Sequence, residues 1–195
     1  LPKILAHKYL PDHDISLYLD SSLEIKEPDI YRLIDECLED KDIALYRHFC
    51  RDCIYDEIAF CANSSERPVN NWLCEAAIEK YRAANYPVKN GFFENAFIIR
   101  KNNDLIKKLN EYWWIEYING AERDQFTLMY CLWKLGIKPN AISIGEQFRK
   151  NPYVNWKKHI YTKYENLNNI NQNNNLFNFS FLSEDVWWRN FTWPY

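Results

Sequence analysis

The fold is decided by the stretch ISLYLDSSLEI, residues 15–25. Its first half, from Ile15 to Leu19, is a short apolar run that follows Pro11, and such a run is typical of a buried β-strand. Asp20 comes next, and a carboxylate at the end of a buried strand is costly to desolvate unless something binds it. Because ligands of open α/β sheets bind beyond the carboxyl ends of the strands, Asp20 marks a candidate binding edge. The alternative is an aspartate that only caps a turn.

The composition narrows the class of protein. The 195 residues are 47% hydrophobic, which is enough for one sizeable core in a single domain. The formal net charge of −3 gives no basic excess, so a nucleic-acid partner held through its phosphates is not expected. No apolar run reaches the roughly 18 residues of a membrane span. We expect a cytoplasmic protein or, if the chain is part of a longer one, a membrane-associated domain in a Golgi-type lumen.

Strand and helix patterns alternate along the chain, which predicts the α/β class. Apolar residues at helical spacing predict helices, and short apolar runs bounded by turn residues predict strands. The expected strands lie at 15–19, 42–49, 91–102 and 141–145. The expected helices lie within 1–10, 27–40, 53–62 and 70–86, from Asn103 onward, and within 119–136, the last two being stacked.

Three segments make up the expected domain organisation. Residues 1–160 form the domain, and residues 161–175 are an Asn-rich loop or linker of low complexity. Residues 176–195 form an aromatic tail that we expect to dock on the domain or on a partner. The six cysteines lack the dense spacing of a secreted disulfide scaffold, so we expect reduced, buried thiols. The alternative is a structural zinc site at Cys50, Cys53, Cys61 and Cys74.

Two charged stretches are candidates for binding. In RHFCRDCIYDE, residues 47–57, the cations Arg47 and Arg51 flank His48, which suits phosphate or carboxylate binding, and Glu57 could orient one of them. An exposed basic patch is the alternative. Arg123, Asp124 and Gln125 follow Gly120 at the start of a helix, where an acidic side chain caps well. A simple helix cap is the alternative there.

Taken in order, four stretches resemble one known family. They are PKILAHKYLPDHDISLYLDSSLEI, RHFCRDCIYDE, KNGFFENAFIIR and WWIEYINGAERDQFTLMYCLWKLGI, within residues 3–150. The resemblance is to the domain-of-unknown-function 616 family, which is glycosyltransferase-like. It implies a GT-A type fold, a mixed sheet flanked by helices, in which a nucleoside-diphosphate sugar is the donor. The acceptor would be a hydroxyl group of a glycan, lipid or protein.

The resemblance also implies roles for particular residues. Asp20, with Ser22, stands where such enzymes hold a divalent cation, Mn²⁺ or Mg²⁺, although the motif here is Asp-Ser-Ser and lacks the second carboxylate of Asp-x-Asp. We assign the general base to Asp124, with Glu94 in reserve. The expected donor and phosphate contacts are Lys3, His7, Lys8, Arg47, His48 and Arg51. The expected sugar contacts are Asn90, Arg123 and Gln125. Trp113 or Trp114 could form an aromatic platform, but core packing is favoured for both.

One departure from the family pattern leaves other functions open. A GT-A domain begins with a strand-helix-strand unit that holds the nucleotide base, and the sequence given begins just before the strand of Asp20. We therefore expect the domain to lack this N-terminal half, and an upstream segment or a partner to cover the sheet. The main alternative is a non-catalytic module that binds glycan or protein. A weaker one is a metal-assisted hydrolase that uses Asp20, His48 and His159.

Overall fold

The computed structural model describes residues 1–26, 30–63, 69–121 and 123–157. The chain divides into two units, Leu1–Lys158 and His159–Tyr195, and every described residue belongs to the first. His159, the predicted linker at 161–175 and the predicted tail at 176–195 lie outside the described residues.

A four-stranded mixed sheet forms the centre of the first unit, in the order β1-β4-β3-β5. Its strands are β1 (Ile15–Leu19), β3 (Ile43–Arg47), β4 (Phe93–Lys101) and β5 (Asn140–Ala141). Strand β4 is antiparallel to both β1 and β3, whereas β5 runs parallel to β3. The predicted α/β class with a mixed sheet is confirmed. The last strand was expected at 141–145, but its pairing covers only two residues.

The α-helices lie within the predicted stretches. They are α1 (Ala6–Tyr9), α2 (Ile30–Leu38), α3 (Ile54–Ala62), α4 (Asn71–Ala83), α5 (Asp104–Ile118) and α6 (Asp124–Lys134). The 3-10 turn η1 (Phe148–Lys150) was not predicted. Asn70 and Asn103 cap α4 and α5, because each side chain accepts hydrogen bonds from backbone N–H groups of the first turn. Gly120 permits the turn between α5 and α6, since a Cβ there would lie 2.5 Å from the carbonyl oxygen of Glu116.

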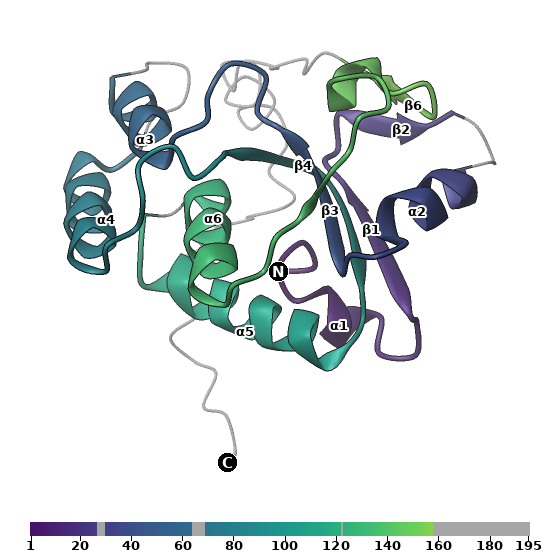
Figure 1. Cartoon of the computed structure of the whole chain (residues 1–195), viewed down its shortest axis with the longest axis horizontal. Helices are drawn as coiled ribbons and strands as arrows, with labels where there is room; N and C mark the ends of the chain where they lie inside the picture. The colour runs from purple at the N-terminus through teal and green to yellow at the C-terminus, as the bar shows by residue number, and fades with distance from the viewer. Residues whose placement is uncertain (27–29, 64–68, 122, 158–195) are drawn as a thin grey trace, which may run out of the picture. The chain divides into compact units, whose positions relative to one another are not determined.

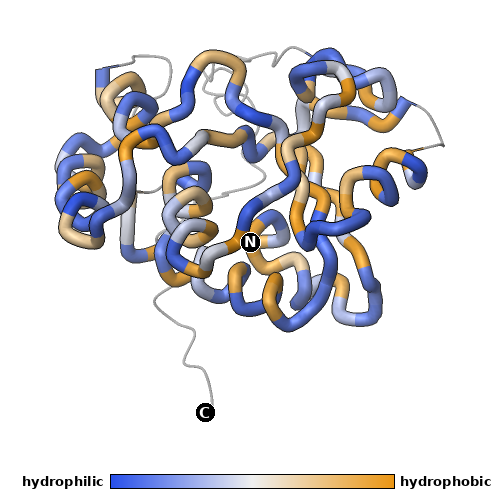
Figure 2. The backbone as a smooth tube through the Cα atoms, viewed as in Figure 1, coloured by the Kyte–Doolittle hydropathy of each residue, from blue (hydrophilic) through white to orange (hydrophobic). Residues whose placement is uncertain are grey.

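The main sheet has a hydrophobic core on each face (Figure 1). On one face, residues of helices α3 to α6 share a core with β3 and β4 around Trp113 and Phe126; of these helices, α6 packs directly on β4, and α3 packs on α4 and α6. On the other, α2 packs against the same strands around Leu33 and Phe97. Figure 2 shows that hydrophobic residues recur along the strands and that hydrophobic and hydrophilic residues alternate along the helices. No helix in the described ranges has the length and apolar character that a bilayer crossing would need.

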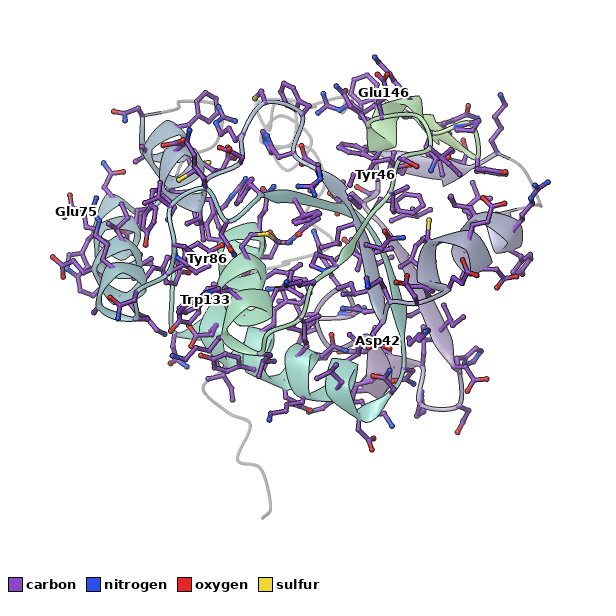
Figure 3. The ribbon with its side chains drawn as sticks, in the orientation of Figure 1. Asp42, Tyr46, Glu75, Tyr86, Trp133 and Glu146 are labelled. Carbon is purple, nitrogen blue, oxygen red and sulfur yellow. The ribbon has the colours of Figure 1, made fainter. Side chains whose placement is uncertain are left out.

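A second, two-stranded sheet was not predicted. It pairs β2 (Leu23–Ile25) antiparallel with β6 (Val154–Trp156). Tyr46 of β3 fixes the intervening chain, because its hydroxyl donates to the carbonyl oxygen of Ile144 at 2.7 Å and accepts from the Asn151 amide at 2.7 Å. Figure 3 labels this tyrosine beneath the loop that carries Glu146. The small sheet therefore closes over the face of the main sheet that α2 covers.

Candidate functional site

The ends of three strands meet at one edge of the main sheet. Strand β1 ends next to the start of β4, where the backbone N–H of Asp20 donates to the carbonyl of Ala96 at 2.9 Å. Strand β3 ends on the other side, where the N–H of His48 donates to the carbonyl of Phe92 at 2.8 Å. The start of α6 reaches the same edge, because the Gln125 amide donates to the carbonyl of Phe93 at 2.8 Å. The fold thus brings four stretches that are separate in the sequence, around Asp20, His48, Phe93 and Gln125, to the same edge of the sheet.

Lys3, Asp20 and Asp124 form the first cluster at this edge, the Lys3 cluster. The ammonium of Lys3 lies 3.3 Å from Asp20 Oδ1 and 2.6 Å from Asp124 Oδ2. The side chains of Lys3, Asp20 and Asp124 are 19%, 38% and 27% exposed, so solvent and solutes reach them. Lys3, the predicted donor contact, therefore directly contacts both Asp20, the predicted cation ligand, and Asp124, the predicted base.

A buried arginine positions Lys3. Arg100 of β4 donates to the backbone carbonyls of Lys3 and Ile4 and to the side chains of Ser16 and Asn110. Burial lowers the pKa of Arg100 to about 10, which still leaves the guanidinium charged at neutral pH. Because these bonds fix the backbone at residues 3 and 4, the N-terminal segment lies against β1 and β4.

Neighbouring side chains position the two aspartates. The hydroxyl of Tyr18 donates to Asp20 Oδ1 at 2.9 Å. Burial and the nearby carboxylate of Asp20 raise the pKa of Tyr18, so its hydroxyl keeps its proton and remains a donor. Trp113 is fully buried, as the core-packing interpretation expects, and its Nε1–H donates to the carbonyl of Asp124 at 2.9 Å. Trp114, in contrast, is partly buried and stacks on Tyr117.

A second cluster, the Glu57 cluster, surrounds a carboxylate that is 0% exposed. Arg51 Nη1 lies 2.7 Å from Glu57 Oε2, and Arg123 Nη2 lies 4.0 Å from Glu57 Oε1. Cys61 donates to Glu57 Oε1 at 3.5 Å. Two arginines thus balance one buried charge, which satisfies the condition under which a charge is tolerated in a protein interior. The arginine side chains keep some exposure, at 20% for Arg51 and 24% for Arg123.

His48 links the Glu57 cluster to Glu94. Its Nδ1 accepts from the backbone N–H of Arg51 at 3.2 Å, so a neutral imidazole carries its proton on Nε2. That Nε2 lies 3.6 Å from Glu94 Oε1 and 3.8 Å from Glu57 Oε2. Glu94 is mostly buried, whereas Arg47 is exposed, and both line a small hollow together with Arg149. The structure therefore brings together Arg47, His48 and Arg51 with the predicted reserve base.

The remaining predicted residues have other neighbours. His7 and Lys8 lie on the far side of the N-terminal segment, at 3.1 Å and 2.9 Å from Glu111 Oε1 of α5. The Asn90 amide donates to the hydroxyl of Tyr86 at 3.4 Å. Tyr86 in turn lies beside Trp133, between α4 and α6 (Figure 3), and borders an open hollow of about 480 Å³. That hollow is lined by Cys53, Tyr55, Asp56, Arg82, Asn85, Tyr86 and Val88.

The donor set at Asp20 suits a divalent cation only in combination with other ligands. Asp20 and Asp124 offer hard carboxylate oxygens, but Ser22 is buried in the following turn. Within the described ranges no three His, Cys, Asp or Glu side chains are grouped as metal ligands. Mg²⁺ is commonly held by one or two carboxylates together with substrate phosphates, and this pair fits that pattern.

All six cysteines are free thiols, and only Cys50 among them is exposed.

Sequence reasoning missed Asn95, which is 4% exposed in β4. In the part of the chain that the structure describes, neither its amide nitrogen nor its carbonyl oxygen has a hydrogen-bond partner. It lies between Glu94 and Ala96, where the pairing of β3 with β4 shifts register. Buried polar groups are normally satisfied, so an unsatisfied amide at this edge is notable. The signal in the sequence was a polar residue inside the run FFENAFII.

Residues 1–159 match the family described as TOD1/MUCI70, glycosyltransferase-like domain. This is the family that the sequence resembles as domain of unknown function 616, and the match spans both clusters. No curated protein and no solved structure matches the chain.

Proposed function

We propose, from the premise that this chain belongs to the TOD1/MUCI70 glycosyltransferase-like domain family, that it transfers a sugar from a nucleoside diphosphate to a hydroxyl acceptor. The observation that carries the proposal is the contact of Lys3 with Asp20 and Asp124 at one sheet edge. This reaction needs a positive group that stabilises the leaving phosphate, which Lys3 would supply. It also needs one carboxylate that binds a divalent cation, for which we propose Asp20, and one that takes a proton, for which we propose Asp124.

The transfer makes one bond and breaks another. The acceptor oxygen bonds to the anomeric carbon, and the bond from that carbon to the phosphate oxygen breaks. The electron pair leaves with the nucleoside diphosphate, where negative charge develops. Lys3 is placed to stabilise that charge, and a divalent cation held by Asp20 and the donor phosphates would add Lewis-acid stabilisation when bound.

Asp124 is our choice for the group that takes the acceptor proton. It lies in the first turn of α6, its carboxylate is partly exposed, and Trp113 fixes its backbone. Glu94 remains the reserve, because it faces His48 Nε2. Gln125 is less accessible to a sugar, since its side chain is buried and donates to Phe93.

The Glu57 cluster supports donor binding in this proposal. Arg51 and Arg123 both contact Glu57 and remain partly exposed, so each could direct further N–H donors towards phosphate oxygens. Buried Asn95, with its unsatisfied amide, lies in the same region of β4.

The test uses the full-length protein with a panel of UDP- and GDP-sugars and mixed hydroxyl acceptors. The assay follows the release of free nucleoside diphosphate. Asp124→Asn keeps the shape of the side chain but loses its basicity, and Asp124 caps no backbone N–H group in α6 as the structure describes that helix, so we expect release to fall about 100-fold or more. The control is Asp104→Asn, which changes an exposed aspartate in the first turn of α5 and should release at the parent rate.

Two outcomes would reject parts of this proposal. Near-normal transfer by a folded Asp124→Asn variant would remove Asp124 from the role of base. Binding of a sugar ligand without any release of nucleoside diphosphate would instead favour the alternative, a non-catalytic binding module.

A further inference from the structure

We propose that Lys3 is a latch on both aspartates, and that the diphosphate of an arriving donor releases it. In the donor-free protein the ammonium pairs with Asp20 and Asp124 together. This pairing places a positive charge on the carboxylate oxygens that a divalent cation and the acceptor hydroxyl would otherwise contact. The identity of the releasing anion rests on the function proposed above, whereas the pairing itself rests only on the contacts.

The first argument is the position of the ammonium. Its nitrogen lies within 3.3 Å of an Asp20 oxygen and within 2.6 Å of an Asp124 oxygen. A cation ligated by Asp20 would therefore lie next to a positive charge that is already present. Like charges at such a distance repel strongly in a partly buried site, where side-chain exposure is only 19% for Lys3. Lys3 and a divalent cation thus compete for the same carboxylates.

The second argument is the number of donors that Lys3 carries. An ammonium has three N–H groups; Lys3 donates one to Asp20 and forms an ion pair with Asp124, so contacts with two aspartates leave at least one donor available. The third can receive a phosphate oxygen before either carboxylate is released. A diphosphate carries several negative oxygens, so it can then draw the ammonium away from both carboxylates.

The third argument is that the backbone of Lys3 is held separately from its ammonium. Arg100 holds the carbonyls of residues 3 and 4, so the segment stays in place. The ammonium lies on a flexible four-carbon stem, 5.0 Å from the centroid of the Tyr18 ring. Releasing the latch therefore requires a side-chain movement only.

Movement of Lys3 to the donor would free both carboxylates at once. Asp20 could then ligate a cation that also contacts the donor phosphates, and Asp124 could accept the acceptor proton. Donor binding would thus precede both events, which makes activation of the acceptor conditional on a bound donor.

The test measures Mn²⁺ binding to the full-length protein by titration calorimetry, without any nucleotide. We expect Lys3→Met to bind Mn²⁺ at least about 10-fold more tightly than the parent. Without the ammonium, both carboxylates can contact a cation at the position that it occupied. Adding Asp20→Asn to Lys3→Met should abolish the gain. Lys3→Arg keeps the charge and should bind Mn²⁺ as weakly as the parent.

Lys107→Met is the matched control, since it removes a surface lysine of α5 that pairs with Asp104. It should leave Mn²⁺ binding unchanged. Lys3→Gln repeats the test with a second neutral side chain, and circular dichroism verifies folding. Equal Mn²⁺ affinity in the parent and in both folded neutral variants would overturn the latch.

A second arm separates the latch from the proposed function. Saturating UDP or GDP should raise the Mn²⁺ affinity of the parent, measured against a blank of nucleotide and Mn²⁺ alone. If neither nucleotide does so while Lys3→Met still gains affinity, the latch stands and the nucleotide-sugar donor is rejected.

Discussion

The Lys3 cluster and the Glu57 cluster lie at the same edge of the main sheet, yet they differ in exposure and in charge balance. Asp20 and Asp124 are 38% and 27% exposed and share one lysine. Glu57 is 0% exposed and lies against two arginines. The first cluster therefore has more anions than cations, and the second has more cations than anions.

The difference indicates a division of roles. An exposed pair can exchange its partner for a ligand, because water stabilises each charge during the exchange. A buried carboxylate cannot lose its partners without a large desolvation cost, so the Glu57 cluster should stay fixed. We infer that the Glu57 cluster maintains the shape of the edge while the Lys3 cluster changes during turnover.

The largest expected effect is on stability, from Glu57→Gln. The change removes the anion that balances Arg51 and Arg123, so we expect the free energy of unfolding to fall by about 3 kcal/mol. Urea denaturation followed by circular dichroism measures it. Glu111→Gln is the control, because Glu111 is a half-exposed carboxylate paired with Lys8 and should cost less than about 1 kcal/mol. Similar costs for the two variants would remove the contrast between the clusters.

A smaller effect, on activity, is expected from Asp20→Asn. Nucleoside diphosphate release should fall about 10-fold, equivalent to about 1.4 kcal/mol of transition-state stabilisation. The unfolding free energy should change by less than about 1 kcal/mol, because the side chain is well exposed. The control is Asp42→Asn, a carboxylate that lies at the other end of the sheet near Lys101 (Figure 3). A large stability loss with unchanged release would make Asp20 structural.

The smallest effect is expected from Tyr18→Phe. The variant loses only the O–H donated to Asp20, which should cost about 1 kcal/mol of transition-state stabilisation, less than the loss expected from Asp20→Asn. Because the pKa of Tyr18 is raised above its usual value of about 10, the hydroxyl stays protonated from about pH 7 to about pH 9. The ratio of parent to variant activity should therefore stay constant over that range. A ratio that changes there would mean that Tyr18 titrates during turnover.

Much of the fold was predictable because its signals are local. The run before Asp20 predicted β1, and the apolar stripe from Ile30 to Leu38 predicted α2, in both cases through periodicity. Strands β2 and β6 have three residues each, too few for any periodicity to appear. The strand expected at 141–145 lies instead at Asn140–Ala141, because local sequence does not reveal where pairing begins and ends.

The sequence singled out most of the charged residues that meet in the two clusters, but it did not predict their contacts. Asp20 and Asp124 follow recognisable boundaries, the end of a strand and the start of a helix. Nothing local indicated that Lys3 would join both aspartates or that Arg100 would hold its carbonyl. Those contacts depend on how distant segments pack, which a single sequence does not specify. The placement of His7 and Lys8 beside Glu111 depends on the same packing.

The bond from Arg100 to the carbonyl of Lys3 joins residues 97 positions apart in the chain. Contacts of such separation form only after a large loop has closed, and they slow folding relative to local contacts. The N-terminal segment should accordingly dock late, once β4 and α5 are in place. Because Asp124 lies in α6, the contact of Lys3 with both aspartates cannot form before α6 has been synthesised. The Lys3 cluster would in this way be completed only after the chain from Lys3 to α6 has been made.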